Sequence, residues 1–291
     1  MNLVNTNRTT DSRQRERLQR NVKSIVTHLI LILASVIMLI PFVWMISTSF
    51  KPASEILTWP PKLIPINPTW ANYFKVFTTT LIVRYFFNSL IIAVVSTLFV
   101  LATSLVAGYI FAKFRFPGRN LLFLLIVATA IVPFEAYMVP FYLQMIALKW
   151  INTYQGIIAP YVIMSFGIFL MRQHISSAIP DEFIDAARID GASEWSIFRL
   201  IIVPMSTSAM GALGTFAFIQ AWGAFIWPLL IASSDKIFNM ELGLAAFQFK
   251  FSVDYGPLMA GSVLNIIPII IAFIFLRRQI IENIALSGLK G

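Results

Sequence analysis

The sequence contains no cysteine and few charged residues. Of its 291 residues, only 12% are charged and 58% are hydrophobic. Without cysteine the chain cannot form a disulfide, a thiolate metal site or a cysteine nucleophile. The shortage of charge also excludes an ordinary soluble domain, because apolar residues are in large excess over what such a core requires. The composition therefore predicts an integral membrane protein.

The motifs of common catalytic sites are missing as well. The chain has no GxxxxGK[ST] phosphate loop, no HExxH, no GxSxG and no clustered set of acidic ligands. Its two histidines, His28 and His174, have no His, Asp or Glu three or four residues later, which favours interfacial roles over metal binding. We therefore expect no catalytic, cofactor-binding or metal-binding residues, and a protein that is not an enzyme.

What the chain does have is a series of uncharged or nearly uncharged apolar runs that are long enough to cross a bilayer. We expect an all-α polytopic membrane fold with six transmembrane helices, at residues 25–46, 85–112, 121–143, 154–171, about 201–231 and 257–276. The third run is interrupted by Pro133 and Pro140. The fifth is longer than one span requires, so it is expected to combine a span with a re-entrant or interfacial segment.

These runs place a single transmembrane domain at residues 25–278. Before it, residues 1–24 are polar and rich in arginine, which predicts a mostly disordered basic arm. An external loop is expected at 49–83, because its prolines prevent a continuous helix and its tryptophans favour the membrane interface. A polar inner loop covers 172–200, and residues 279–291 form a tail.

The formal net charge of +9 is compatible with a nucleic-acid partner or with anionic lipid. The distribution of the charge favours lipid and membrane topology. Placing both termini and the loops near residues 113–120 and 172–200 on one side gives that side 15 of the 22 lysines and arginines. The positive-inside rule then puts both termini in the cytoplasm, and we expect no nucleic-acid partner.

The longest polar interruption late in the sequence runs from residue 181 to 204. Pro180 suits a first helical position, and the carboxylates of Asp181, Glu182 and Asp185 suit a helix N-terminus. Gly191 is expected to end this short helix, and Ser193 can cap the next one, which continues into the membrane. The stretch predicts an exposed helical knob that is rigidly tied to a membrane span.

The same stretch carries a motif. Asp185-Ala186-Ala187, then Asp190-Gly191-Ala192-Ser193, then Phe198 and Pro204, resembles the "EAA" loop of ABC importer permeases. The rest of the chain after about residue 51 resembles the carbohydrate and glycerol-phosphate branch, and is similar to the maltose-type second permease. The segments that carry this second resemblance are YFFNSL at 85–90, FRFPGR at 114–119, WPLL at 227–230 and GLKG at 288–291.

The resemblance implies an ABC type I importer fold with a cytoplasmic coupling helix. It implies docking to the ATPase through one group of residues: Glu182, Asp185, Ala186, Ala187, Asp190 and Gly191. Asp185 stands where the family usually has Glu, and Glu182 is one turn upstream. The terminal Lys290 and Gly291 are implied to contact the ATPase subunits. Gly223 and Ala224 differ from the residues that the branch often has after its tryptophan, here Trp222.

The resemblance also implies a set of partners. A dimer of ABC ATPase subunits would bind ATP and magnesium, so this chain itself needs no cofactor. A second, homologous permease and an extracytoplasmic solute-binding protein would complete the assembly in a bacterial or archaeal cell (inner) membrane. The substrate would be a small carbohydrate, either a sugar, an oligosaccharide or a related polyol, but no motif selects one and no substrate-binding residue is assigned.

Glu135 is an acidic residue within an apolar run, where a lone carboxylate costs about 2.5 to 3.5 kcal/mol on insertion scales. Three interpretations remain open: a structural hydrogen-bond partner, a contact in a gate or substrate path, or a position near the outer interface. Trp222 is a second possible cavity or gate residue.

The alternative function is that of an ATP-independent secondary transporter or channel for a small polar solute. Ion-coupled transporters usually need several intramembrane ionisable groups or paired broken helices in repeated halves. This sequence offers one deep carboxylate and no recognisable repeat. The importer is therefore favoured, and a membrane-bound enzyme is disfavoured further because no catalytic constellation is present.

Overall fold

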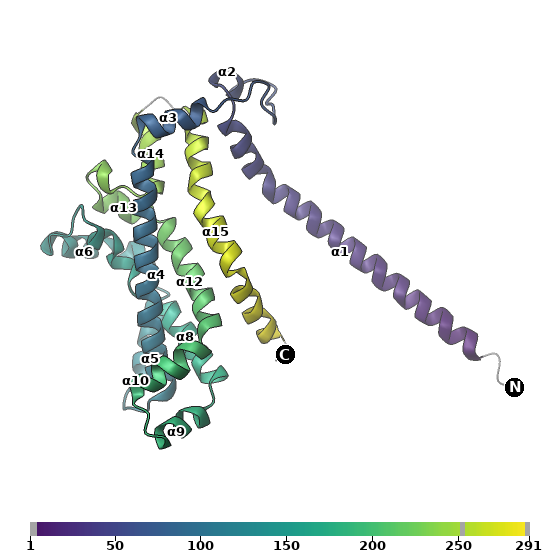
Figure 1. The fold of residues 1–291 in the computed structure, drawn as a ribbon, viewed down its shortest axis with the longest axis vertical. Coiled ribbons are helices and arrows are strands. Elements are labelled where there is room, and N and C mark those ends of the chain that lie inside the picture. The colour runs from purple at the N-terminus through teal and green to yellow at the C-terminus, as the bar shows by residue number, and fades with distance from the viewer. Residues whose placement is uncertain (1–4, 251–253, 289–291) are drawn as a thin grey trace.

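The computed structural model describes residues 5–250 and 254–288, and the side chains of residues 19–245 and 254–275. All regular secondary structure in the described chain is helical (Figure 1). Three long helices run through the molecule: α1 (Asn5–Ser49), α4 (Ile82–Lys113) and α15 (Tyr255–Gly288). Their apolar parts, Gln19–Ser49, Ile82–Lys113 and Tyr255–Phe275, are long enough to cross a bilayer.

The other three apolar runs form pairs of helices joined at a sharp bend. Helix α5 (Arg119–Thr129) meets α6 (Phe134–Ala147) at 96°, and α7 (Tyr154–Ile158) with η1 (Ala159–Tyr161) meets α8 (Ser165–Ala178) at 47°. In the third pair, α10 (Glu194–Ile197), η2 (Phe198–Ile202) and α11 (Val203–Met205) precede α12 (Thr207–Trp222) at a 75° bend. Counting each pair as one span gives six, as the sequence predicts.

The bends follow from the chain's prolines and polar breaks. Pro133 is the N-cap of α6 and has no N–H to continue the preceding helix, while Pro160 lies in the short 3₁₀ turn η1. The sequence predicts a rigid connection from Ser193 into the membrane span, and this prediction is wrong. The helix is π-helical from Phe198 to Ile202, and the chain then bends at Ser206. The polar knob is therefore connected to α12 through a bend.

The prediction that residues 1–24 are mostly disordered is also wrong for residues 5–24, which the structure describes as helical. Helix α1 begins at Asn5 and continues without a break into the first apolar run. Residues 13–20 (RQRERLQR) consist of arginine, glutamine, glutamate and leucine, which have high helix propensity, so the helix of the first apolar run extends into them at little cost. High polarity alone did not indicate disorder here.

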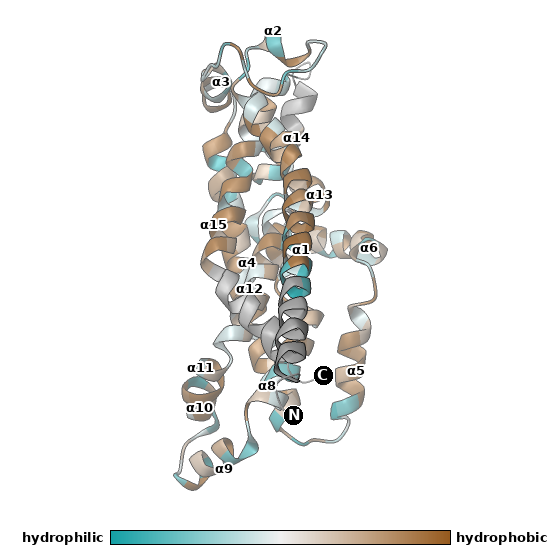
Figure 2. Cartoon of the chain, turned by 90° about the vertical axis from the view of Figure 1, so that its right-hand side faces the viewer, coloured by the Kyte–Doolittle hydropathy of each residue, from teal (hydrophilic) through white to brown (hydrophobic). Residues whose placement is uncertain are grey.

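Several short elements lie toward the end of the molecule opposite α9 (Figure 1). They are α2 (Ala53–Ile56), α3 (Ala71–Thr79), α13 (Ile226–Ile231), η3 (Asp235–Ile237) and α14 (Met240–Lys250). Figure 2 shows hydrophobic residues along the middle of the long helices, with hydrophilic residues near α2 at one end and near α9 (Asp181–Ile189) and the start of α5 at the other. This distribution is that of a membrane protein with two polar ends.

Helix α4 is the centre of the bundle and packs closely on α8 and α12. Small residues permit the close approach to α8. A Cβ atom on Gly108 would lie 2.7 Å from the Cβ of Met171, and one on Gly167 would lie 2.4 Å from Oγ of Ser104. Such contacts between small residues drive helix association in lipid. The half of this bundle nearest α9 supports the candidate site.

Candidate functional site

Helix α9 is an exposed knob at one end of the molecule (Figure 1). Pro180 is its N-cap, one position earlier than expected, and Asp181 and Glu182 lie in its first turn as expected. Ile184 is 1% exposed and anchors the helix in the core formed with α4 and α8. Ile189, in contrast, is 86% exposed. The helix therefore has one anchored face and one face that is free in this chain.

The turn after α9 has the geometry that the sequence predicts. Gly191 has φ of +81°, a left-handed conformation that glycine adopts without steric cost. The amide of Ala192 donates to the carbonyl of Ala187 at 2.9 Å, and that of Gly191 donates to Arg188 at 3.0 Å, which together make a Schellman motif. Ser193 then caps α10 by accepting from the amide of Ser196 at 3.2 Å. Both the helix end at Gly191 and the cap at Ser193 are confirmed.

A polar chain connects this turn to α4. Arg188 donates through Nε to Oε1 of Glu194 at 2.8 Å, and through Nη1 contacts Oδ1 of Asp185 at 3.4 Å. The other carboxylate oxygen of Glu194 accepts from the hydroxyl of Tyr109 at 2.8 Å. Tyr109 is 4% exposed, on the last turns of α4. Hydrogen bonds to charged groups are stronger than neutral ones, so the turn is held to α4 as well as to its own helix.

Lys113 makes a second connection between α4 and α9. Its ammonium donates to the carbonyl of Ile179 at 2.6 Å and to Oδ1 of Asp181 at 2.5 Å. The hydrogen bond from Lys113 and the positive charge of Lys113 lower the pKa of the Asp181 carboxyl below its usual range. The lysine side chain is 5% exposed and that of Asp181 is 72% exposed, so the bond is made at the edge of the bundle.

The residues expected to dock the ATPase lie together on α9 and the turn that follows it. Glu182, Asp185, Ala186, Asp190 and Gly191 are exposed. Ala187 is half-buried and packs against the core. The expected contacts of Lys290 and Gly291 lie outside the described residues.

The sequence reasoning missed Tyr109, Lys113 and Glu194. Their partners are far away in the chain: Tyr109 is 85 residues from Glu194, and Lys113 is 68 residues from Asp181. No motif or spacing in the sequence connects them. A basic residue at the end of α4 was visible, but it also fits the simple interpretation of a topology signal.

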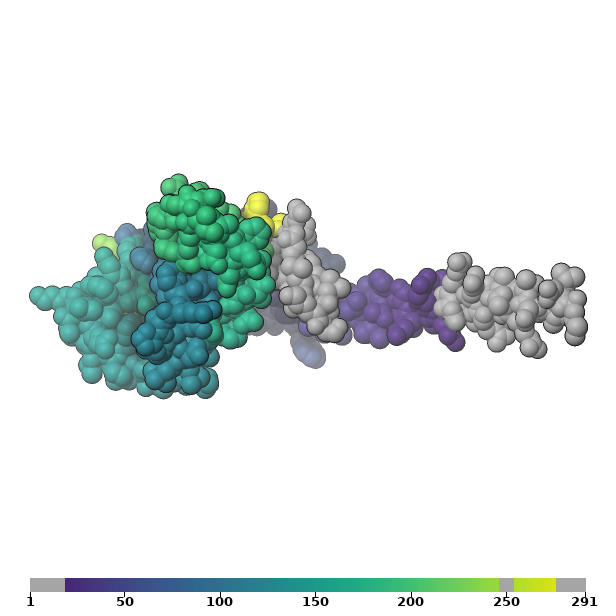
Figure 3. All heavy atoms as spheres, turned by 90° about the horizontal axis from the view of Figure 1, so that it is seen from below, coloured from purple at the N-terminus to yellow at the C-terminus, as the bar shows by residue number. Residues whose placement is uncertain are grey.

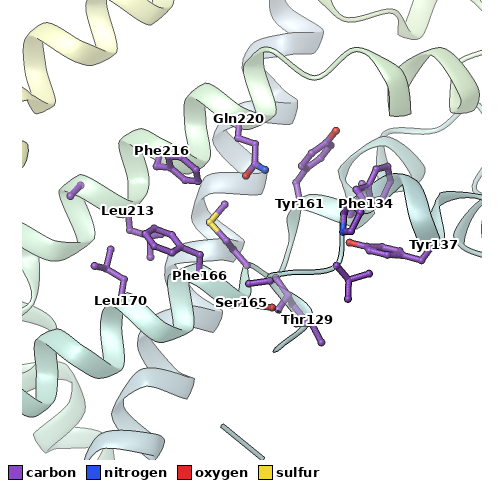
Figure 4. A pocket seen from close by; sticks show the side chains of 17 residues that line it. Thr129, Phe134, Tyr137, Tyr161, Ser165, Phe166, Leu170, Leu213, Phe216 and Gln220 are labelled. Carbon is purple, nitrogen blue, oxygen red and sulfur yellow. Dashed lines mark hydrogen bonds between the residues drawn. The ribbon is translucent and has the colours of Figure 1, made fainter. Parts of the chain in front are cut away.

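A second feature is a cavity of about 700 Å³ deeper in the bundle (Figure 4). It forms where two spans are broken, between the α5–α6 bend, the η1–α8 bend and helix α12. One part of its wall is aromatic, with Phe134, Phe166 and Phe216 among the lining residues. Its polar lining comes from Thr129, Tyr137, Tyr161, Ser165 and Gln220.

The polar groups of the cavity suit an uncharged ligand with many hydroxyl groups. Hydroxyl and amide side chains both donate and accept hydrogen bonds, and the hydroxyls of Thr129 and Ser165 lie 2.7 Å apart across the two bends. None of the residues that line the cavity is charged. Apolar walls with a few polar groups are typical of small-molecule sites. Gln220 had not been singled out from the sequence, because one glutamine in an apolar run carries no clear signal.

Glu135 and Trp222 do not line this cavity. Glu135 lies in the first turn of α6 and is exposed, and no hydrogen bond or ion pair is made by it within the described residues. Trp222 is fully buried, where its Nε1 donates to Oδ1 of Asn265 at 2.9 Å and its ring stacks on Phe218. In this structure Trp222 connects α12 to α15, and a role for either residue in a gate stays a prediction.

Comparison with known proteins identifies similar chains. A model of the family described as binding-protein-dependent transport system inner membrane component matches residues 104–281. The arabinooligosaccharides transport system permease protein of Halalkalibacterium halodurans is 35% identical over 254 residues, covering 86% of this chain and 91% of that protein. The trehalose/maltose transport system permease protein of Thermococcus litoralis is 31% identical, covering 89% of this chain and 94% of that protein.

Solved structures give the same result for the fold. One chain of a bacterial ABC transporter involved in the import of the acidic polysaccharide alginate superposes with a TM-score of 0.78 at 22% identity. The superposition covers 89% of this chain and 97% of that chain. The overall fold is therefore shared with that chain.

Proposed function

This chain belongs to the family of binding-protein-dependent transport system inner membrane components, and from that premise we propose how its two sites work together. It is a multi-pass permease subunit of an ABC importer of the carbohydrate-uptake branch, with the fold of such permeases. We propose the energy source of this permease, its substrate and its orientation in the membrane. In the proposed orientation, α9 and both termini lie in the cytoplasm.

The exposed face of α9 is the docking surface for a cytoplasmic ATPase, which supplies the energy that this chain has no motif to provide. ATP, magnesium and hydrolysis belong to that partner. Support comes from the position of the motif residues Asp185, Ala186 and Gly191 on a knob that projects from the bundle. A second permease and an extracytoplasmic solute-binding protein complete the transporter, as the family name and the alginate transporter in complex with its periplasmic protein suggest.

Motion of the ATPase is transmitted mainly to α4. Because Lys113 and Tyr109 bind the two ends of the α9 region, a displacement of α9 moves the end of α4 with it. The bend at Ser206 lets α12 change its angle to α10 during this displacement. Rigid movement of packed helices between two arrangements would open the α5–α6–α8–α12 cavity alternately to each side.

The substrate is an uncharged saccharide or polyol. The single observation that supports this is the composition of the 700 Å³ cavity, whose lining has aromatic, hydroxyl and amide side chains and no charge. The relatives named for arabinooligosaccharides and for trehalose/maltose transport agree with this class. Thermal shift measurements on the associated binding protein with a panel of sugars and polyols would identify the compound.

The coupling role is tested in the assembled transporter, by measuring ATP hydrolysis stimulated by the binding protein together with sugar uptake. Asp185→Ala changes the docking face, whereas Tyr109→Phe removes a single hydroxyl inside the bundle and leaves that face intact. We expect Asp185→Ala to weaken co-purification of the ATPase. We expect Tyr109→Phe to keep the ATPase bound but to lower the uptake per ATP hydrolysed.

The control is Asp235→Ala at the external end of the chain. It should change neither the co-purification of the ATPase nor the sugar uptake per ATP hydrolysed. Normal stimulation and normal uptake in both test variants would refute the coupling role. A chain that purifies without any ATPase and still takes up sugar in gradient-loaded, ATP-free vesicles would support the alternative of a secondary transporter or channel.

A further inference from the structure

The turn between α4 and α5 contains a basic cavity that the proposed function does not use. It has a volume of about 280 Å³ and is lined by Arg115, Phe116, Gly118, Arg119, Asn120 and Leu121. Figure 3 looks at the molecule from the α9 end and shows the blue atoms of this part of the chain on the outside of the bundle, beside the green atoms of the α9–α10 region. The segment that lines the cavity therefore lies at the α9 end of the bundle.

Three arginines give this region its charge. Arg115 is exposed and Arg119 is half-buried, with Nη1 donating to the carbonyl of Phe114 at 3.0 Å. The guanidinium of Arg172 lies over the ring of Phe123 at 3.9 Å and is near enough to Arg119 for their charges to interact. Asp181, whose carboxylate also interacts with the charge of Arg115, is bound directly by Lys113. Within the described residues, none of the three arginines forms an ion pair.

The start of α5 adds hydrogen-bond donors to the same place. Gly118 is its N-cap and offers no side chain to accept from the first turn. The amides of Arg119 and Leu122 have backbone acceptors, but those of Asn120 and Leu121 have none in the part of the chain that the structure describes. Free amides at a helix start favour an anion, which reinforces the positive charge of the arginines.

The surroundings indicate what kind of anion fits. Beyond the cavity, α5 presents an exposed apolar surface, with Leu121, Leu124 and Leu125 between 55% and 62% exposed. In the proposed orientation, a basic cavity at the start of this exposed apolar helix lies at the depth of the phospholipid headgroups. Arginine matches phosphate geometry with two parallel hydrogen bonds, which lysine cannot do.

We propose that this cavity binds the phosphate of an anionic phospholipid in the cytoplasmic leaflet. Arg115 and Arg119 bind the phosphate, Arg172 contributes charge, and the acyl chains follow the leucines of α5. The inference rests on the proposed orientation, because it needs the α4–α5 turn to face the cytoplasmic leaflet. The bound lipid would hold the turn that leaves Lys113, and so would stabilise the part of α4 that contacts α9.

The test uses the whole importer, purified from nanodiscs made of phosphatidylcholine with increasing amounts of phosphatidylglycerol. Native mass spectrometry then counts the phosphatidylglycerol molecules that stay bound. A basic residue near the headgroups contributes about fivefold in affinity, so the double variant Arg115→Gln/Arg119→Gln should need about 25 times more phosphatidylglycerol for the same occupancy. Arg119→Lys keeps the charge, is less disruptive to folding, and should give a smaller loss.

The matched control is Arg20→Gln on α1, which removes an exposed arginine that does not line the cavity, on the same expected side of the membrane. If the double variant retains as much phosphatidylglycerol as this control, the proposal is wrong. Displacement of the lipid from the native protein by excess inorganic phosphate would instead identify a site for a free anion, and this result would also overturn the proposal. Sugar uptake by the same preparations is measured separately, so a failed lipid site and a failed importer function can be told apart.

Discussion

Gly191 is a residue where backbone conformation alone decides the outcome of a substitution. Its φ of +81° is strained for any residue with a Cβ, yet a Cβ there would touch nothing within 4 Å. We expect Gly191→Ala to destabilise the turn by about 1 to 2 kcal/mol, purely through the left-handed conformation. Gly191→Asn should lose less, because asparagine tolerates this region better.

Protection of the α9 amides from hydrogen exchange would measure this effect. The control is Gly223→Ala at the end of α12, where φ is −81° and the nearest atom to a new Cβ is 3.4 Å away. Equal behaviour of the two alanine variants would contradict the role of the Gly191 conformation.

Glu55 makes the loop between α1 and α3 sensitive to pH. Its carboxylate accepts from the amide of Ile66 at 2.9 Å, and from the amide and side chain of Asn67 at 3.1 Å and 2.9 Å. The bond from Ile66, followed by those from Asn67, lowers the pKa of Glu55 in the folded protein. The stabilisation is therefore fully present above the unfolded pKa of about 4.3, and it is lost as the pH falls through the lower, folded value.

We expect the protection factors of the Ile66 and Asn67 amides to fall in acid in the native protein. Glu55→Gln has no charge to titrate, so its protection factors should stay constant over the same range. A parallel fall in this variant would show that another group controls the loop.

At the scale of the elements, packing between α4 and α8 can be tested by substituting Gly108 on α4, with Gly214 on α12 as a control. In Gly108→Ala the new Cβ would lie 2.9 Å from the backbone nitrogen of Arg172, so the two helices must move apart. In Gly214→Ala the nearest atom, on Leu101, is 3.5 Å away, an ordinary contact. Both gain the same helix propensity, which makes them a matched pair.

We expect Gly108→Ala to lower the stability by about 1 to 3 kcal/mol and Gly214→Ala to be neutral or slightly stabilising. Thermal unfolding of the detergent-solubilised importer compares them. If Gly108→Ala melts with the native protein, the close approach of α4 to α8 is not a stabilising feature. Because α8 leads directly into Pro180 and α9, the same variant should also weaken coupling.

The positions of the helices and turns were predictable where they depend on local sequence, such as the length of an apolar run or the place of a proline or glycine. Apolar length gave the six spans, Pro133 marked one break, and Gly191 and Ser193 marked the turn after α9. Pro204 indicates that the helix after Ser193 is interrupted, but it specifies neither the bend at Ser206 nor the π-helical geometry of 198–202, so these two features were not predicted. The contacts of Tyr109, Lys113 and Gln220 depend on which helices meet in space, and one sequence does not contain that information.

At the scale of the whole molecule, much of the apolar surface has no partner within this chain. The apolar window of α1 is 0% buried and that of α15 is 28% buried. Figure 1 shows α1 leaving the bundle near α2 and extending away from it. A surrounding bilayer or another protein chain is therefore required to cover these helices, and the orientation of the chain determines which side of the membrane each polar end reaches.

The proposed orientation predicts that the loop after α1 and helix α9 lie on opposite sides of the membrane. Because the sequence contains no cysteine, single introduced cysteines can test this. Trp59→Cys in the external loop is at a position that is 91% exposed, and Ile189→Cys on α9 is at one that is 86% exposed. A membrane-impermeant maleimide should label the first only from outside the cell and the second only in inverted vesicles. Removing the ATPase should increase labelling at Ile189→Cys, because the docked partner covers α9, and should leave labelling at Trp59→Cys unchanged. Labelling of both positions from the same side would contradict the topology, and labelling of Ile189→Cys that ignores the ATPase would contradict the docking surface.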